Sequence, residues 1–187
     1  LVYGDQPRRS ILQRPGADRV ALELHSMSKA YNMTGWRLAF FAGAPWAVEA
    51  VANVKDNSDS GQFKAIQHAA AAGIREESLV HEIRGHYERR LEKMAAALRG
   101  AGFDAHMPGG TFYLYVAAPS GAGDVNFASA EEASLFLITE HSISTVPWDD
   151  VGAFLRFSAT FESAGGDDDD RVLAELAQRL ERCRLRF

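Results

Sequence analysis

The chain has 187 residues, of which 47% are hydrophobic and 24% are charged, the proportions of an ordinary globular protein with a core in one or two domains. A net charge of −5 with 20 scattered basic residues argues against nucleic-acid binding, and no apolar run approaches the roughly 20 residues that span a bilayer. The single cysteine, Cys183, cannot form an internal disulfide. These properties predict a cytoplasmic protein that binds neither nucleic acid nor membrane.

The first 75 residues alternate strand and helix candidates. Short apolar runs predict strands at residues 20–24 and 38–43, the first of them buried. Helices are expected over 45–56, where Pro45 suits a first turn, and over 62–74 after a polar segment.

Residues 76–98 form the longest helical candidate. Apolar side chains recur there at intervals of three and four residues and form one stripe: Leu79, Ile83, Tyr87, Leu91, Met94 and Leu98. Gly100 and Gly102 end the pattern. A helix of about 23 residues is roughly 35 Å long, which is enough to bridge two domains.

Beyond residue 110 strands and helices are mixed. Strands are expected at 111–116, 143–146 and 154–158, and a helix at 129–141 with Ser129 as its N-cap. The last helix begins in the run Asp167–Asp170, whose negative charges suit a helix N-terminus. We interpret this run as a solvated helix start and predict no metal site.

The segment 24–37 contains the residues most indicative of chemistry. Lys29 follows two serines, Ser26 and Ser28, in a turn after the predicted strand, and Arg37 comes eight residues later. Hydroxyl and backbone N–H groups in such a turn can bind an anion, and a guanidinium adds a planar clamp for phosphate. A lysine amine can form a Schiff base, so the combination suits an enzyme that uses pyridoxal phosphate. The alternative is a solvated surface lysine.

The same segment resembles the cofactor-lysine signature of class I and II aminotransferases. Residues 10–17, 59–67 and 145–150 are similar to stretches of the family's diaminopimelate branch. The resemblance implies an α/β fold: the C-terminal part of the fold-type I large domain over residues 1–77, then a bridging helix and a small α+β domain over 78–187. It also implies amino-group transfer between LL-2,6-diaminopimelate and 2-oxoglutarate in lysine biosynthesis.

The family's residue roles carry over at matching positions. Lys29 corresponds to the Schiff-base lysine that later moves the substrate's proton. Ser26 and Arg37 correspond to ligands of the pyridoxal 5′-phosphate phosphate group, with Ser28 a weaker candidate. Arg156, between apolar neighbours, corresponds to the arginine that binds the substrate's α-carboxylate, and a buried, partnered arginine is expected there rather than an edge-strand surface charge. A homodimer is also implied, because active sites in the family are shared between subunits.

Two positions and the chain's extent leave alternatives open. The family usually has glycine where this chain has Trp148, and Lys64 lies in a segment that in the family reaches the partner's cofactor site. The residues that bind and stack on the cofactor's ring match positions before Leu1, so the chain is expected to be a C-terminal portion that is a poor catalyst alone. Alternatives are an aspartate, alanine or aromatic aminotransferase, a carbon–sulfur lyase, or an aminotransferase-like sensor domain of a transcription regulator.

Overall fold

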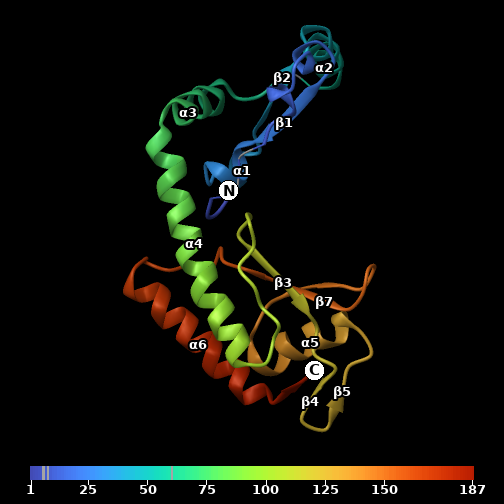
Figure 1. Ribbon diagram of the computed structural model, residues 1–187, viewed down its shortest axis with the longest axis vertical. Coiled ribbons are helices and arrows are strands. Elements are labelled where there is room, and N and C mark those ends of the chain that lie inside the picture. The colour runs from blue at the N-terminus through green and yellow to red at the C-terminus, as the bar shows by residue number, and fades with distance from the viewer. Residues whose placement is uncertain (6, 8, 60) are drawn as a thin grey trace. The chain divides into compact units, whose positions relative to one another are not determined.

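A computed structural model describes residues 1–5, 7, 9–59 and 61–187 of the chain (Figure 1). The chain divides into two compact units, residues 1–85 and residues 86–187, which we call the first and the second unit. Ser60, in the polar segment between two predicted helices, lies outside the described residues. The division into a large-domain part over 1–77 and a small-domain part over 78–187 stays a prediction.

The first unit contains a two-stranded antiparallel sheet and several helices. Its elements are η1 (Ile11–Gln13), η2 (Ala17–Arg19), β1 (Leu22–Ser26), α1 (Met27–Ala30), η3 (Thr34–Trp36), β2 (Ala39–Gly43), α2 (Pro45–Ser58), α3 (Lys64–Arg75) and the start of α4 (Glu77–Gly100). The predicted strands and helices are therefore present, with bounds that differ by one to two residues. Pro45 occupies the first turn of α2, as predicted.

Glycine is required at the end of β2. Gly43 pairs with Leu22 across the sheet and has a φ of +148°. A Cβ at this position would lie 2.2 Å from the carbonyl oxygen of Ala21. The close approach of the two strands therefore excludes any side chain.

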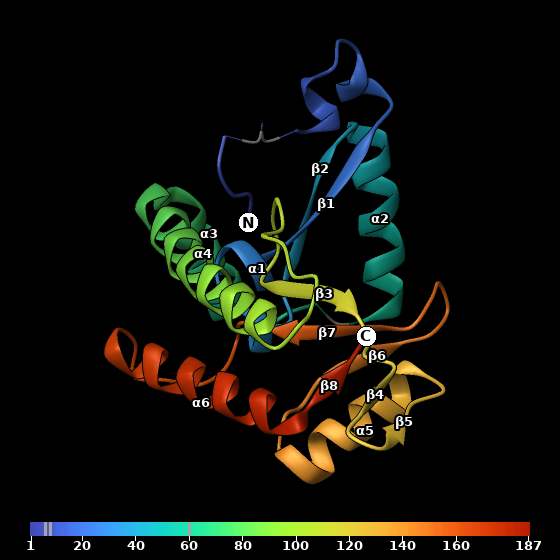
Figure 2. The ribbon, with the colours of Figure 1, turned by 60° about the horizontal axis from the view of Figure 1, so that its bottom comes forward.

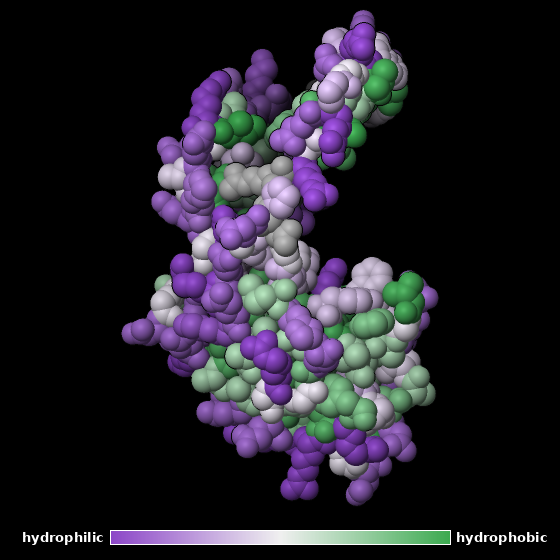
Figure 3. All heavy atoms as spheres, viewed as in Figure 1, coloured by the Kyte–Doolittle hydropathy of each residue, from purple (hydrophilic) through white to green (hydrophobic). Residues whose placement is uncertain are grey.

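The apolar core of the first unit is small. Met27, Leu38 and Ala70 are buried together, which joins the start of α1, the residue before β2 and the middle of α3. The prediction of a buried strand at 20–24 is wrong for the described chain, because the strand lies in a sheet of only two strands and Leu24 is 64% exposed. Hydrophobic side chains are visible on the surface of the β1, β2 and α2 region in Figure 3.

The second unit contains the rest of α4, two further helices and two small antiparallel sheets (Figures 1 and 2). Its elements are β3 (Tyr113–Ala117), β4 (Gly121–Ala122), β5 (Val125–Asn126), α5 (Ala130–His141), β6 (Val146–Trp148), β7 (Phe154–Ser158), α6 (Asp167–Cys183) and β8 (Leu185–Arg186). The strand orders are β3-β7-β6 and β5-β4-β8. The short strands β4, β5 and β8 were not predicted, because two residues carry no periodic signal.

The prediction of a strand at 143–146 is wrong except for its last residue. β6 begins at Val146, and the preceding segment is bound to α5 instead of to a neighbouring strand. The Ser134 hydroxyl donates to the Thr145 carbonyl (3.2 Å), and the Thr145 hydroxyl donates to Ser134 Oγ (2.8 Å). β6 is an edge strand, which is where Pro147 is tolerated.

The core of the second unit lies between the β3-β7-β6 sheet and its helices. Alternate residues of β3 and β7 point into it, with Leu114, Val116, Leu155 and Phe157 all buried. The predicted stripe of α4 is buried from Tyr87 onward, and α6 buries Leu173 and Leu180. Ser129 caps α5 and α6 begins at Asp167, both as predicted. The prediction that the whole aspartate run is solvated is wrong for Asp169, which is buried because it pairs with Arg90. No helix among the described residues is long and apolar enough to cross a membrane.

Candidate active site

The two serines of the lysine segment lie where β1 passes into α1. Ser26 ends the strand and caps the helix, and its Oγ accepts the backbone N–H of Ser28 (3.1 Å). Met27 is fully buried and anchors this turn in the core of the first unit. Its N–H donates to the Leu38 carbonyl. The N–H groups of residues 27 and 28 are therefore already used, contrary to the expectation of free backbone donors. The Ser26 hydroxyl hydrogen remains available as a donor.

Arg37 lies directly after η3 and two residues before β2. Its backbone has a φ of +52°, a left-handed conformation that is uncommon for a residue with a side chain. The guanidinium Nη1 donates to the Thr34 carbonyl (3.0 Å), and the Gln62 amide donates to the Arg37 carbonyl (3.0 Å). Both contacts hold Arg37 in this unusual geometry.

Ser26, Ser28 and Arg37 line one pocket of about 260 Å³, together with Gln62 and Lys55. Lys29 immediately follows Ser28 on α1 and is exposed, but its side chain does not line the pocket. Ser26, Ser28 and Arg37 were predicted from the sequence, because they are close in the chain. Lys55 was not predicted. It lines the pocket from the last turn of α2 and forms an ion pair with Asp59 (2.8 Å).

The chemistry of this pocket fits a phosphate monoester. It offers two hydroxyl groups, a side-chain amide, a guanidinium and an ammonium, which are the donors that bind phosphate oxygens. Leu24 and Phe41 supply apolar wall beside them. The pocket can therefore hold a phosphorylated, partly apolar ligand.

Arg156, the fourth predicted site residue, lies in the second unit on the central strand β7. Its side chain is half-buried, and its Cζ lies 4.4 Å from the ring centroid of Tyr113 and 6.0 Å from that of Trp148. No hydrogen bond or ion pair to its guanidinium occurs among the described residues. The expectation of a buried, partnered arginine is wrong in part, because Arg156 lies on the central strand but is only half-buried and its partners are aromatic rings. Its role toward the substrate stays a prediction.

A different arginine of the second unit is buried and fully partnered. Arg90 of α4 binds both carboxylate oxygens of Asp169 (3.0 and 2.7 Å), the Ser163 hydroxyl (2.6 Å) and the carbonyls of Ala159 and Phe161. Its N–H donors are all used. We conclude that Arg90 joins α4, α6 and the segment after β7, and that it has no capacity left for a ligand.

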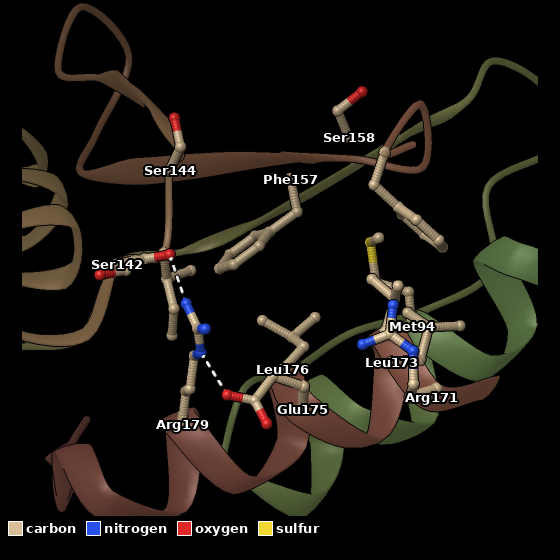
Figure 4. A pocket seen from close by; sticks show the side chains of 13 residues that line it. Met94, Ser142, Ser144, Phe157, Ser158, Arg171, Leu173, Glu175, Leu176 and Arg179 are labelled. Carbon is tan, nitrogen blue, oxygen red and sulfur yellow. Dashed lines mark hydrogen bonds and ion pairs between the residues drawn. The ribbon is translucent and has the colours of Figure 1, made fainter. Parts of the chain in front are cut away.

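Another cavity, of about 350 Å³, lies in the second unit beside α6 (Figure 4). Its floor is apolar and includes Met94, Phe157 and Leu176. The Arg179 guanidinium at its edge is engaged by Glu175 (2.8 Å) and by the Ser142 carbonyl (3.0 Å). We assign no ligand to this cavity, because its charged groups are already bound: Arg179 pairs with Glu175, and Arg171 pairs with Asp168.

Three further residues have no part in the pocket. Burial raises the pKa of the Cys183 thiol to about 11, and its Sγ donates to the Arg179 carbonyl, so the thiol is unreactive. Lys64 is exposed at the start of α3, and His25 is bound to Glu23 (2.9 Å) and stacked on Phe40. Within the described part of the chain, no three His, Cys, Asp or Glu side chains are arranged to hold a metal ion.

The fold and the lysine segment define a class of enzymes. The chain belongs to the aminotransferase class I and II family, whose model matches residues 1–175. The resemblance predicted from the sequence is confirmed, as is the fold-type I α/β architecture.

Two of the most similar relatives share one name within this family. The chain is 53% identical over 186 residues to an LL-diaminopimelate aminotransferase of Methanococcus maripaludis, covering 96% of this chain and 44% of that protein. It is 47% identical to an LL-diaminopimelate aminotransferase of Methanocaldococcus jannaschii, covering 100% of this chain and 46% of the relative. An aromatic aminotransferase from Pyrococcus horikoshii has a similar solved structure, with a TM-score of 0.80 and 25% identity over 97% of this chain and 47% of that one. The chain thus spans about half the length of the relatives that it matches.

Proposed function

We propose that this chain supplies the cofactor-lysine and carboxylate-arginine portion of a pyridoxal 5′-phosphate-dependent aminotransferase. The observation that supports the proposal is the pocket lined by Ser26, Ser28 and Arg37, with Lys29 next to Ser28 in the chain. The pocket's donors suit the phosphate, and Lys29 follows directly on α1. Lys55 and Gln62 are further candidate phosphate ligands.

Bound pyridoxal phosphate would supply an electron sink for the pair of electrons left when a substrate's α-proton departs. The chain's own residues would hold and serve it. Lys29 Nζ would hold the cofactor and would serve as the base that takes the proton from the substrate's α-carbon and returns it. Arg156 binds the α-carboxylate in bidentate fashion and so orients the substrate.

For the substrates we propose LL-2,6-diaminopimelate and 2-oxoglutarate, in lysine biosynthesis. The names of the relatives that are 53% and 47% identical support this choice. We further propose a cytoplasmic homodimer. Because the relatives are about twice as long, the remaining cofactor contacts would come from sequence beyond this chain.

The test uses the full-length protein that carries this chain. Borohydride treatment of the cofactor-loaded enzyme should leave a cofactor adduct on the peptide containing Lys29, found by mass spectrometry. Lys29→Ala should abolish the adduct and lower transamination by about 10³-fold or more, because both attachment and proton transfer are lost. Lys93→Ala is the matched control, because Lys93 is an exposed lysine outside the pocket, and it should keep both.

An adduct on another lysine, or a Lys29→Ala enzyme of normal activity, would refute the assignment. A single-turnover assay decides the substrate. LL-2,6-diaminopimelate should convert the cofactor to its amine form, whereas conversion by aspartate or an aromatic amino acid alone would favour the alternative specificities.

A further inference from the structure

One face of the β3-β7-β6 sheet carries aromatic side chains around Arg156. Alternation along the strands directs every second residue to this face, away from the core. Its members are Tyr113, Tyr115, Val146, Trp148, Phe154 and Arg156. All are at least partly exposed, in contrast to the buried residues of the opposite face. Arg156 lies on the central strand, so it has neighbours on both sides.

Two rings of this face flank the guanidinium from opposite strands. Tyr113 of β3 pairs with Ser158, and Trp148 of β6 pairs with Phe154, so each ring lies diagonally across from Arg156. Their centroids lie 4.4 and 6.0 Å from Arg156 Cζ, within the range of cation–π attraction. Tyr115, which is directly opposite Arg156, stacks on Phe154 instead (4.6 Å between centroids).

Contacts with aromatic rings do not consume the N–H donors of a guanidinium. The N–H donors of Arg156 lie in the plane of the group and bind no residue in the described parts of the chain. Arg90 of the same unit illustrates the opposite arrangement, because its donors are consumed by Asp169, Ser163 and two carbonyls. Arg156 is therefore oriented by its two ring contacts and still able to bind a planar carboxylate through two N–H groups.

We propose that Trp148 is a positioning residue which, together with Tyr113, orients the Arg156 guanidinium for the substrate's carboxylate. This proposal rests on the proposed function of Arg156. Trp148 occupies the position where the family resemblance has glycine, and glycine would leave the β6 side of the guanidinium open to water. Arg156 would then have to be ordered by the substrate itself, at the expense of binding affinity.

The experiment measures steady-state kinetics with 2-oxoglutarate in the cofactor-loaded, full-length enzyme. Trp148→Gly should raise KM for 2-oxoglutarate by about three- to tenfold with kcat within twofold, because weaker ordering of Arg156 reduces binding in the ground state and in the transition state alike. Trp148→Phe keeps a ring at the position and should restore most of the affinity. Tyr115→Ala is the matched control, since it removes an exposed ring from the same face and should leave KM within twofold.

Arg156→Gln separates the two levels of the proposal. If Trp148→Gly leaves KM unchanged while Arg156→Gln raises it strongly, the role of Trp148 is refuted and the proposed function stands. If neither substitution changes KM, the assignment of Arg156 is refuted as well. An equal rise in KM for Trp148→Gly and Tyr115→Ala would also overturn the proposal, because it would indicate a general disturbance of the sheet.

Discussion

At the scale of single residues, the second unit's buried ion pair has the clearest energetic consequence. The guanidinium of Arg90 and the hydroxyl of Ser163 hold the pKa of Asp169 below its usual value, at about 2. Both charges are almost excluded from solvent, so each depends on the other for compensation. Removing one partner leaves a buried charge without its counterion.

We therefore predict that Arg90→Met destabilises the protein by about 3–5 kcal/mol. Lys93→Met is the matched control, because Lys93 lies one turn further along α4 and its ion pair with Asp170 is solvent-exposed. Its cost should stay below about 1 kcal/mol. Urea denaturation followed by circular dichroism measures both, and similar midpoints for the two variants would contradict the prediction.

The same pair predicts a pH dependence. Because the folded pKa of Asp169 is depressed from 3.8 to about 2, the pair contributes its full stability above roughly pH 4. Protonation then removes that contribution as the pH falls from about 4 to 2. Denaturation midpoints at pH 5 and pH 2.5 should therefore differ less in Asp169→Asn than in the unmodified protein. An equal difference would mean that other carboxylates cause the acid sensitivity.

Some residues of the pocket and of the buried ion pair could be predicted from the sequence and others could not. Ser26, Ser28 and Arg37 could be recognised together because they lie within twelve residues. The segment that joins β1 to β2 keeps them close in space. Lys55 and Gln62 line the pocket from α2 and from the segment after it. No local sequence pattern predicts that they lie there. The partners Arg90 and Asp169 are 79 residues apart and were likewise missed.

At the scale of elements, helix α5 has two kinds of cap. Ser129 accepts the Glu132 N–H (3.2 Å), as its position before an acidic first turn predicted. Asp149, nineteen residues beyond the helix start, accepts the N–H groups of Ala130 (2.7 Å) and Glu131 (3.2 Å). Its carboxylate also complements the positive end of the helix and ties it to the loop after Trp148.

Asp149→Ala should therefore destabilise the protein by about 1 kcal/mol, the typical cost of losing a cap. Asp150→Ala is the control, since the adjacent carboxylate is also exposed and makes no hydrogen bond to α5 in the described part of the chain. Thermal unfolding monitored at 222 nm measures both variants. If Asp150→Ala lowers the midpoint as much as Asp149→Ala, net charge and not capping is responsible.

At the scale of the whole molecule, the first unit leaves much apolar surface uncovered. Val54 and Phe63 are 68% and 73% exposed, and among the described residues β1 and β2 pair only with each other. A two-stranded sheet is marginal by itself, and an exposed apolar surface of this kind is typical of an interface. Such a surface suits a chain that is completed by further sequence or by another subunit.

We predict that the isolated 187-residue chain binds a hydrophobic dye such as 8-anilinonaphthalene-1-sulfonate or self-associates. Phe63→Ser should weaken the dye signal, because it removes one of the largest exposed apolar side chains of the first unit. Val151→Ser is a control of similar exposure in the second unit and should leave the signal unchanged. A monomer by light scattering that binds no dye would contradict the prediction.

The sequence by itself determined the family, the lysine segment and most helices and strands, because helical periodicity, capping residues and a turn of a dozen residues are local properties of the chain. Tertiary structure alone decided which arginine of the second unit is consumed by Asp169 and which is held between Tyr113 and Trp148 with its donors available. In the sequence Arg156 has apolar neighbours on both sides, whereas Arg90 lies among charged residues of α4, so the local pattern favours Arg156 as the buried one. The structure shows the reverse, because the contacts that bury Arg90 come from residues 69 to 79 positions away and depend on the packing of the whole unit.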